Sequence, residues 1–134
     1  MMAKKVEKHG TFSWTELMTT DVEAAKDFYE QLFEWEFSKQ DLNDTTYYVI
    51  KLKGQNRPVG GILDSAHEQS GDPQKIPPHW GSYVTVRNIK DTVTLVEKLG
   101  GTILVPPTKI PNTGFFSVIQ DPQGAVISVM EHTF

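Results

Sequence analysis

The sequence predicts an α+β fold made of two tandem copies of one βαβββ module. The first observation is an alternating run at residues 12–18, FSWTELM, followed by a helical pattern with a capping box at Thr20 and Glu23. The second is the same plan at residues 83–87, YVTVR, where a helical pattern begins at Asn88. Since three more strand-like runs follow each helix, the chain divides into two equivalent modules.

The module boundaries follow from where the hydrophobic periodicity stops. Module 1 is expected at about residues 9–63 and module 2 at about residues 79–132. The linker between them, residues 64–78, has no periodicity and carries Ser, Gly and Pro. A chain of 134 residues is long enough to bury one core. We therefore expect a single domain over residues 1–134.

Module 1 is expected to contain one helix and four strands. A strand at residues 9–18 precedes a helix at 21–33, and three strands follow at 35–38, 46–53 and 58–63. The helix has an apolar stripe, which we expect to be buried in the core: Val22, Ala25, Phe28, Tyr29, Leu32 and Phe33. The glycines at positions 60 and 61 indicate a bulge or a close backbone approach in the last strand.

Module 2 repeats this order. Its strand at residues 80–87 leads into a helix at 88–99, which the glycine pair at 100–101 ends. The remaining strands are expected at residues 102–105, 114–120 and 125–131, with a loop at 106–112.

Composition excludes several classes of protein. The formal net charge of -4 argues against a nucleic-acid partner, because phosphate contacts require clustered Lys and Arg. The absence of cysteine excludes a disulfide, a thiolate metal site and a thiol nucleophile. No apolar run approaches the length of a membrane span, and the N-terminus has no apolar signal region. We expect a cytoplasmic protein with no membrane partner.

Several short motifs, taken in order, resemble the vicinal oxygen chelate superfamily, which includes glyoxalase I, extradiol dioxygenases and bleomycin-resistance proteins. The motifs are Thr20-Asp21 with Ala25, Phe28-Tyr29 and Leu32-Phe33 in module 1, and Gly100-Gly101 and Asp121-Pro122-Gln123-Gly124 in module 2. The resemblance covers residues 9–132. It implies a curled, cup-shaped mixed sheet with helices on its convex side, a homodimer, and a cup that commonly holds a divalent metal and a small substrate.

The resemblance also indicates where metal ligands would stand. The family's ligand positions, in the first and last strand of each module, fall on Trp14, Gly61, Gly81 and Ser128. Trp and Gly side chains offer no lone pair, and a single serine hydroxyl is a poor ligand for such metals. We therefore expect no cofactor, although a divalent metal bound by other residues stays open as an alternative.

Other polar groups on the inner face are few. Alternation places Glu16 on the inner face of the first strand and His132 on the inner face of the last, whereas Glu131 points the other way. Glu16 and His132 form the one acid–imidazole pair that the pattern offers. The alternative is structural: Glu16 is hydrogen-bonded at the rim and His132 is solvated near the C-terminus.

Aromatic residues complete a candidate binding site. The predicted ligand-binding residues are Phe12, Trp14, Glu16, Tyr83, Arg87, Ser128 and His132. Tyr48 and Trp80 are expected at the mouth of the cup. Aromatic walls with a few polar groups suit a small apolar or aromatic ligand. In the alternative, these rings fill the cup or face a second subunit.

Two classes of function follow. The first is a binding protein, similar to the bleomycin-resistance members, that holds a small molecule in a cup without the usual metal ligands. The second is a glyoxalase-type lyase or isomerase, or a dioxygenase-like enzyme, with a metal on non-standard ligands and Glu16 as the candidate base. Proton transfer alone contributes only about 10²–10⁴-fold, so binding without catalysis is the favoured class.

Overall fold

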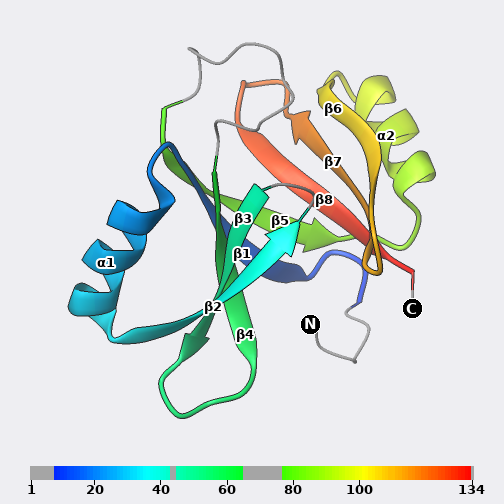
Figure 1. The fold of residues 1–134 in the computed structure, drawn as a ribbon. Coiled ribbons are helices and arrows are strands. Elements are labelled where there is room, and N and C mark those ends of the chain that lie inside the picture. The colour runs from blue at the N-terminus through cyan, green and yellow to red at the C-terminus, as the bar shows by residue number, and fades with distance from the viewer. Residues whose placement is uncertain (1–7, 43–44, 65–76, 134) are drawn as a thin grey trace. The chain divides into compact units, whose positions relative to one another are not determined.

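The computed structural model describes residues 8–42, 45–64 and 77–133. Figure 1 shows the order of the elements, βαβββ repeated once. They are β1 (Phe12–Thr19), α1 (Val22–Phe33), β2 (Trp35–Leu42), β3 (Thr45–Leu52), β4 (Pro58–Asp64), β5 (His79–Thr85), α2 (Ile89–Lys98), β6 (Thr102–Ile110), β7 (Gly114–Gln120) and β8 (Val126–His132). The predicted α+β class with two βαβββ modules is confirmed. Most of the predicted linker, residues 65–76, lies outside the described residues.

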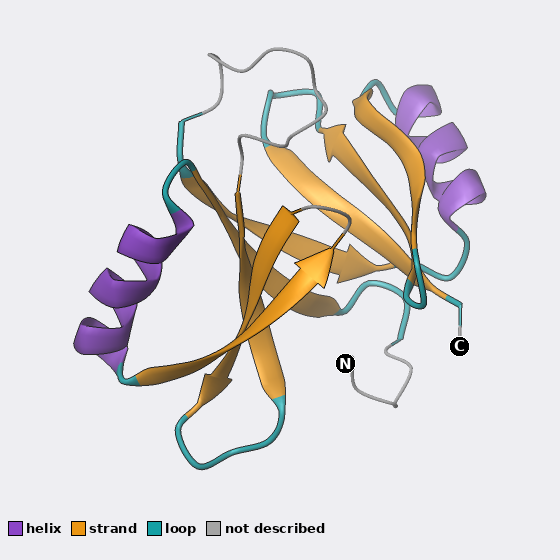
Figure 2. Ribbon diagram, viewed as in Figure 1, coloured by secondary structure: helices purple, strands orange, loops and turns teal. Residues whose placement is uncertain are grey.

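The chain forms two compact units. Among the described residues, one unit extends from residue 14 to residue 80, and the other joins residues 81–133 with residues 8–13. Within the first unit the strand order is β2-β3-β4-β1, and within the second it is β5-β8-β7-β6. Figure 2 shows the strands in orange and the helices in purple. β1 pairs with β4 and β5 with β8 in parallel, whereas the other pairs within each unit are antiparallel.

The two units share one strand register as well as one topology. In the parallel pair of the first unit, Glu16 stands opposite Gly61. In the second unit Tyr83 stands opposite Ser128, and each of these two residues lies the same number of positions after its counterpart. The internal repeat predicted from the sequence is therefore present at the level of single residue pairs.

Each sheet has one face covered by its helix. In the first unit, Leu17 and Ile62 are buried together with Val22 of α1. Because successive strand side chains alternate between faces, Glu16 and Gly61 lie on the face away from α1. In the second unit, Val129 is buried with Ile89 of α2, so the neighbouring residues of β5 and β8 lie on the face away from α2.

The predicted burial of the α1 stripe is wrong over its second half. Phe28 is 57% exposed, Leu32 is 55% exposed and Phe33 is 51% exposed. The stripe was identified by helical period, which does not say how much of the helix the sheet covers. Here the core contacts run through Val22, Ala25 and Tyr29, so only part of the stripe packs against the core.

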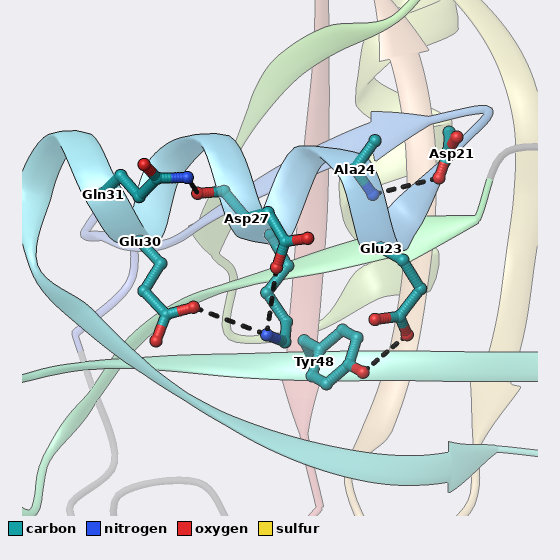
Figure 3. Close-up of polar contacts among 8 residues, drawn as sticks. Asp21, Glu23, Ala24, Asp27, Glu30, Gln31 and Tyr48 are labelled. Atoms are coloured by element: carbon teal, nitrogen blue, oxygen red, sulfur yellow. Dashed lines mark hydrogen bonds and ion pairs between the residues drawn. The ribbon is translucent and has the colours of Figure 1, made fainter.

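The helix starts also differ in detail. The predicted capping box at Thr20 is not formed, because Asp21 caps α1 by accepting a hydrogen bond from the Ala24 backbone N–H at 3.0 Å (Figure 3). The predicted start at Asn88 is confirmed, since its side chain accepts from the Asp91 N–H at 3.0 Å.

The predicted loop at residues 106–112 is mostly strand. β6 continues to Ile110 although it contains Pro106 and Pro107, with register shifts against β7 on the way. Proline is tolerated there because β6 pairs only with β7 in its unit, so it needs no second ladder of donors.

Candidate functional site

The candidate site lies in the first unit and centres on the hydroxyl of Tyr47. The Trp14 indole N–H donates to the Tyr47 oxygen at 3.0 Å, and the Tyr47 hydroxyl lies 2.7 Å from Oε2 of Glu16. An indole nitrogen can only donate, so the Tyr47 O–H is left to donate to the Glu16 carboxylate. The direction of both hydrogen bonds is thereby fixed.

Gly61 makes this arrangement sterically feasible. Tyr47 is on β3 and Glu16 on β1, and β4 lies between these strands. The Tyr47 side chain crosses β4 at Gly61, where an added Cβ would overlap the phenol ring and its oxygen. The glycine anticipated as a close approach therefore leaves the space that the Tyr47 ring fills. We call Trp14, Glu16, Tyr47 and Gly61 the Tyr47 site.

The Tyr47 site is shielded from water. Glu16 and Tyr47 are each 8% exposed. A buried carboxylate is strongly unfavourable unless hydrogen bonds compensate for its lost hydration, and the short bond from Tyr47 is one such compensation. The structure thus agrees with a structural role for Glu16 while also placing its carboxylate among aromatic side chains on the helix-free face.

The family's metal positions can be compared with this geometry. In the first unit they fall on Trp14, whose N–H is used by Tyr47, and on Gly61, whose side-chain space Tyr47 occupies. In the second unit they fall on Gly81 and Ser128. Within residues 8–42, 45–64 and 77–133, no group of three or more His, Cys, Asp or Glu is placed to hold a metal ion.

The predicted residues of the second unit are only partly gathered. Tyr83 and Ser128 stand opposite each other on the face away from α2, and His132 is at the end of β8 opposite Gly114. The Thr85 hydroxyl on β5 is buried and has no hydrogen-bond partner in the part of the chain that the structure describes. These residues give the second unit its own set of polar groups.

Two further residues of the second unit are Arg87 and Glu131, and their contacts differ. Arg87 lies beyond the end of β5 and is exposed, while its backbone N–H donates to His9 Nδ1 at 2.9 Å. The Glu131 carboxylate accepts a hydrogen bond from the Ile89 N–H at the start of α2 at 2.8 Å. Its side chain therefore lies on the α2 side of β8, which confirms the predicted direction.

Three predicted aromatic positions are not part of the Tyr47 site. Phe12 is 70% exposed at the start of β1. Tyr48 is on the α1 side of its sheet, where its hydroxyl donates to Glu23 at 2.6 Å (Figure 3). Trp80 donates to the Tyr29 hydroxyl of α1 at 3.2 Å. The prediction that Tyr48 and Trp80 lie at the mouth of a binding cup is therefore wrong.

Tyr48 has an altered acidity as a result. Its hydrogen bond to Glu23, together with its burial and the nearby negative charges of Glu23 and Asp27, raises its pKa from 10.0 to about 12. The neutral phenol is the form that can donate to a carboxylate, so the hydrogen bond from Tyr48 to Glu23 links β3 to α1.

Tyr47 is the site residue that the sequence analysis missed. The run TTYYVIKL alternates, so its two tyrosines must face opposite sides of the sheet. Tyr48 shares a face with buried Ile50, which leaves Tyr47 on the face of Gly61. Gly61 was the signal that the sequence offered, because a glycine leaves space that a large side chain on the same face of the sheet can fill.

Sequence comparisons agree on one family. A sequence model of the Glyoxalase/Bleomycin resistance protein/Dioxygenase superfamily matches residues 11–129. "Putative glyoxylase CFP32" of Mycobacterium tuberculosis is 32% identical over 133 residues, which are 97% of this chain and 49% of that protein. Anthracycline biosynthesis protein DnrV of Streptomyces peucetius is 30% identical over 91% of this chain and 42% of its own length. The chain thus spans about half the length of the curated relatives it matches.

Solved structures share the fold. Methylmalonyl-CoA epimerase from Mycobacterium tuberculosis aligns with a TM-score of 0.64 at 11% identity, covering 100% of this chain and 94% of that one. A Streptomyces coelicolor methylmalonyl-CoA epimerase in complex with 2-nitronate-propionyl-CoA aligns with a TM-score of 0.68 at 11% identity, covering 95% and 100%. At these identities the similarity establishes the fold.

Proposed function

Because the chain belongs to the Glyoxalase/Bleomycin resistance protein/Dioxygenase superfamily, we propose that it binds a small apolar or aromatic molecule without a metal ion. The observation that supports this proposal most strongly is the Tyr47 site. Two positions where the family would place metal ligands are replaced there by an indole and by a phenol lying over a glycine. The result is a largely buried aromatic site that contains a carboxylate.

The hydrogen-bond directions narrow the class of ligand. The indole N–H and the phenol O–H of the site both donate within the protein. The Glu16 carboxylate can only accept hydrogen bonds, and Tyr47 donates one of them at 2.7 Å. A ligand therefore gains most from an aromatic body with a hydrogen-bond donor, such as an amine, and a cationic donor also gains from the faces of Trp14 and Tyr47.

The second unit supplies further candidates. Tyr83, Ser128 and His132 lie on its strands β5 and β8 and remain in the proposal as ligand-binding residues. Phe12 and Arg87 are exposed and are not included.

A thermal-shift screen with matched compounds tests the proposal. Aromatic amines are compared with aromatic carboxylates that have the same ring. We expect amines to raise the unfolding temperature, because a ligand at about 100 times its Kd stabilises by about 2.7 kcal/mol. Glu16→Gln and Trp14→Ala should reduce the shift more than they reduce the stability of the free protein.

Trp80→Ala serves as the matched control, since Trp80 contacts α1 and not the Tyr47 site. The proposal fails if no compound stabilises the wild type. It fails equally if Trp80→Ala weakens binding as much as Trp14→Ala.

A glyoxalase-type lyase or isomerase is the second candidate, favoured by the name of the mycobacterial relatives and by the buried Glu16. In this reaction class, Glu16 would remove a proton next to a carbonyl group, with its carboxylate oriented by Tyr47. Deuterium uptake from heavy water into a carbonyl substrate, lost in Glu16→Gln, would support it. Uptake that persists in this variant would exclude Glu16 as the base.

A further inference from the structure

Thr85 on β5 has a buried side-chain hydroxyl that the chain leaves unpaired. The residue is 3% exposed, and its Oγ1 has no hydrogen-bond partner among the residues whose structure is described. The backbone of Thr85 is already engaged, because its N–H donates to the Thr11 carbonyl and its carbonyl accepts from the Gly10 N–H, both at 2.8 Å. An unpaired buried hydroxyl is unfavourable, so it indicates a partner that is not part of the chain.

The hydroxyl lies on the face of the second unit away from α2. Val84 stands opposite Val129, which is buried against α2, so Thr85 points to the other side of the sheet. On that side Thr85 stands opposite Met130 of β8, and Met130 stands opposite Phe116 of β7. The Thr85 hydroxyl is therefore at one end of a row formed by a thioether and a phenyl ring.

A second row runs beside this one on the same face. Tyr83 stands opposite Ser128, and Ser128 stands opposite Val118. These three side chains and Phe116 are each partly exposed, so a small molecule can reach this face. Met130 is buried, but a methionine side chain is unbranched and adapts to a neighbouring group. We call the following residues the Thr85 site: Tyr83, Thr85, Phe116, Ser128 and Met130.

The chemistry of the Thr85 site favours a neutral acceptor. A hydroxyl offers one hydrogen to donate, and buried donors without a partner are rarer in proteins than underused acceptors. The members of the site carry no charged side chain, so nothing in it offsets the loss of hydration that an ion would suffer. An apolar or aromatic body with a ketone or ether oxygen supplies the acceptor at no such cost.

We propose that the Thr85 site is a second ligand site, which holds a neutral aromatic compound through an oxygen atom that accepts from the Thr85 hydroxyl. The inference rests on the proposed function, since Tyr83 and Ser128 were kept there as ligand-binding residues. It does not depend on Glu16 or Trp14, because the Tyr47 site selects hydrogen-bond donors and the Thr85 site selects an acceptor. A buried water would satisfy the Thr85 hydroxyl equally well, so the test must separate the two occupants.

Acetophenone and ethylbenzene test the proposal, because they share a ring and a similar shape and differ in the carbonyl oxygen. An NMR titration followed at the methyl group of Met130 gives both dissociation constants. We expect acetophenone to bind about 2–10-fold more tightly than ethylbenzene to the wild type, and equally tightly to Thr85→Val. The free Thr85→Val protein should have an equal or higher urea midpoint, since no hydrogen bond is lost.

Ser117→Ala is the matched control on the opposite face of the sheet. Ser117 stands opposite Val129 and is fully buried, and its hydroxyl donates to the Val105 carbonyl at 2.6 Å. This variant should lower the urea midpoint and leave the preference for acetophenone unchanged. Glu16→Gln should likewise leave it unchanged, although it weakens the binding of aromatic amines at the Tyr47 site.

The outcomes distinguish the two proposals. Equal binding of acetophenone and ethylbenzene to the wild type, or no change at Met130 with either compound, overturns the Thr85 site and leaves a water as its occupant. A lower urea midpoint in Thr85→Val shows that the hydroxyl already has a partner in the free protein, and this also overturns it. If aromatic amines fail to bind while the preference for acetophenone holds and is lost in Thr85→Val, the Tyr47 site is refuted and the Thr85 site is supported.

Discussion

Replacing Tyr47 by Phe tests the Tyr47 site with the smallest possible change. The substitution removes one oxygen atom and leaves the ring that lies over Gly61 in place. The Glu16 carboxylate, buried to within 8% exposure, loses the donor at 2.7 Å, and the Trp14 N–H loses its acceptor at 3.0 Å. Each group therefore loses one hydrogen bond in a site that water hardly reaches.

The magnitude follows from those two losses. A hydrogen bond to a charged group contributes about 1.5–3 kcal/mol, and a partly buried neutral donor without a partner adds about 1 kcal/mol. We therefore expect Tyr47→Phe to lower the free energy of unfolding by about 2.5–4 kcal/mol. This is a large share of the stability of a small domain.

Tyr48→Phe is the matched control in the adjacent position. Its hydroxyl donates to Glu23, which is exposed and regains water when the bond is lost. That variant should lose only about 0.5–1.5 kcal/mol. Urea unfolding of the three proteins, followed by circular dichroism, gives both values. If Tyr47→Phe is no more destabilising than Tyr48→Phe, Glu16 is not held in a buried site as described.

Three further outcomes are expected. Gly61→Ala should be destabilising by at least about 2 kcal/mol because its methyl group meets Tyr47, and nearly neutral in a Tyr47→Ala background, as a double-mutant cycle in urea would show. Glu131→Ala should remove the side-chain acceptor at the start of α2 and lose about 1 kcal/mol, with Glu131→Gln losing less, measured by thermal unfolding. Because its bond to Glu23 raises the Tyr48 pKa from 10.0 to about 12, the wild type holds this proton more tightly when folded. Its advantage over Tyr48→Phe should be complete below pH 10.0 and disappear as the pH rises through about 12, in urea midpoints measured against pH.

The topology could be predicted because the hydrophobic alternation, the helix cap and the turn residues all indicated the same order of elements. The alternation in residues 12–18 and 83–87, the cap at Asn88 and the glycines after α2 all belong to short-range chemistry. Such signals fix the order of strands and helices. The equal registers of Glu16 with Gly61 and Tyr83 with Ser128 then follow from the repeat.

The composition of the site was harder to predict, because it depends on which strand lies between two others. Trp14, Glu16 and Gly61 were identified from their positions in the module, and the structure brings these three together. Tyr47 was missed because it joins them only by crossing β4, a relation that strand order determines and local pattern does not. The same limit explains Phe28, because the helical period predicts its burial but does not say which part of the stripe packs against the core.

Elemental analysis of protein purified without chelators or a polyhistidine tag tests the central claim most directly, namely that a hydrogen-bonded aromatic site replaces the family's metal centre. The account predicts less than stoichiometric metal, because Trp14 and Gly61 offer no side-chain lone pair and Tyr47 fills the space between them. About one equivalent of zinc, nickel, manganese or iron per chain, lost together with stability on chelation, would contradict it.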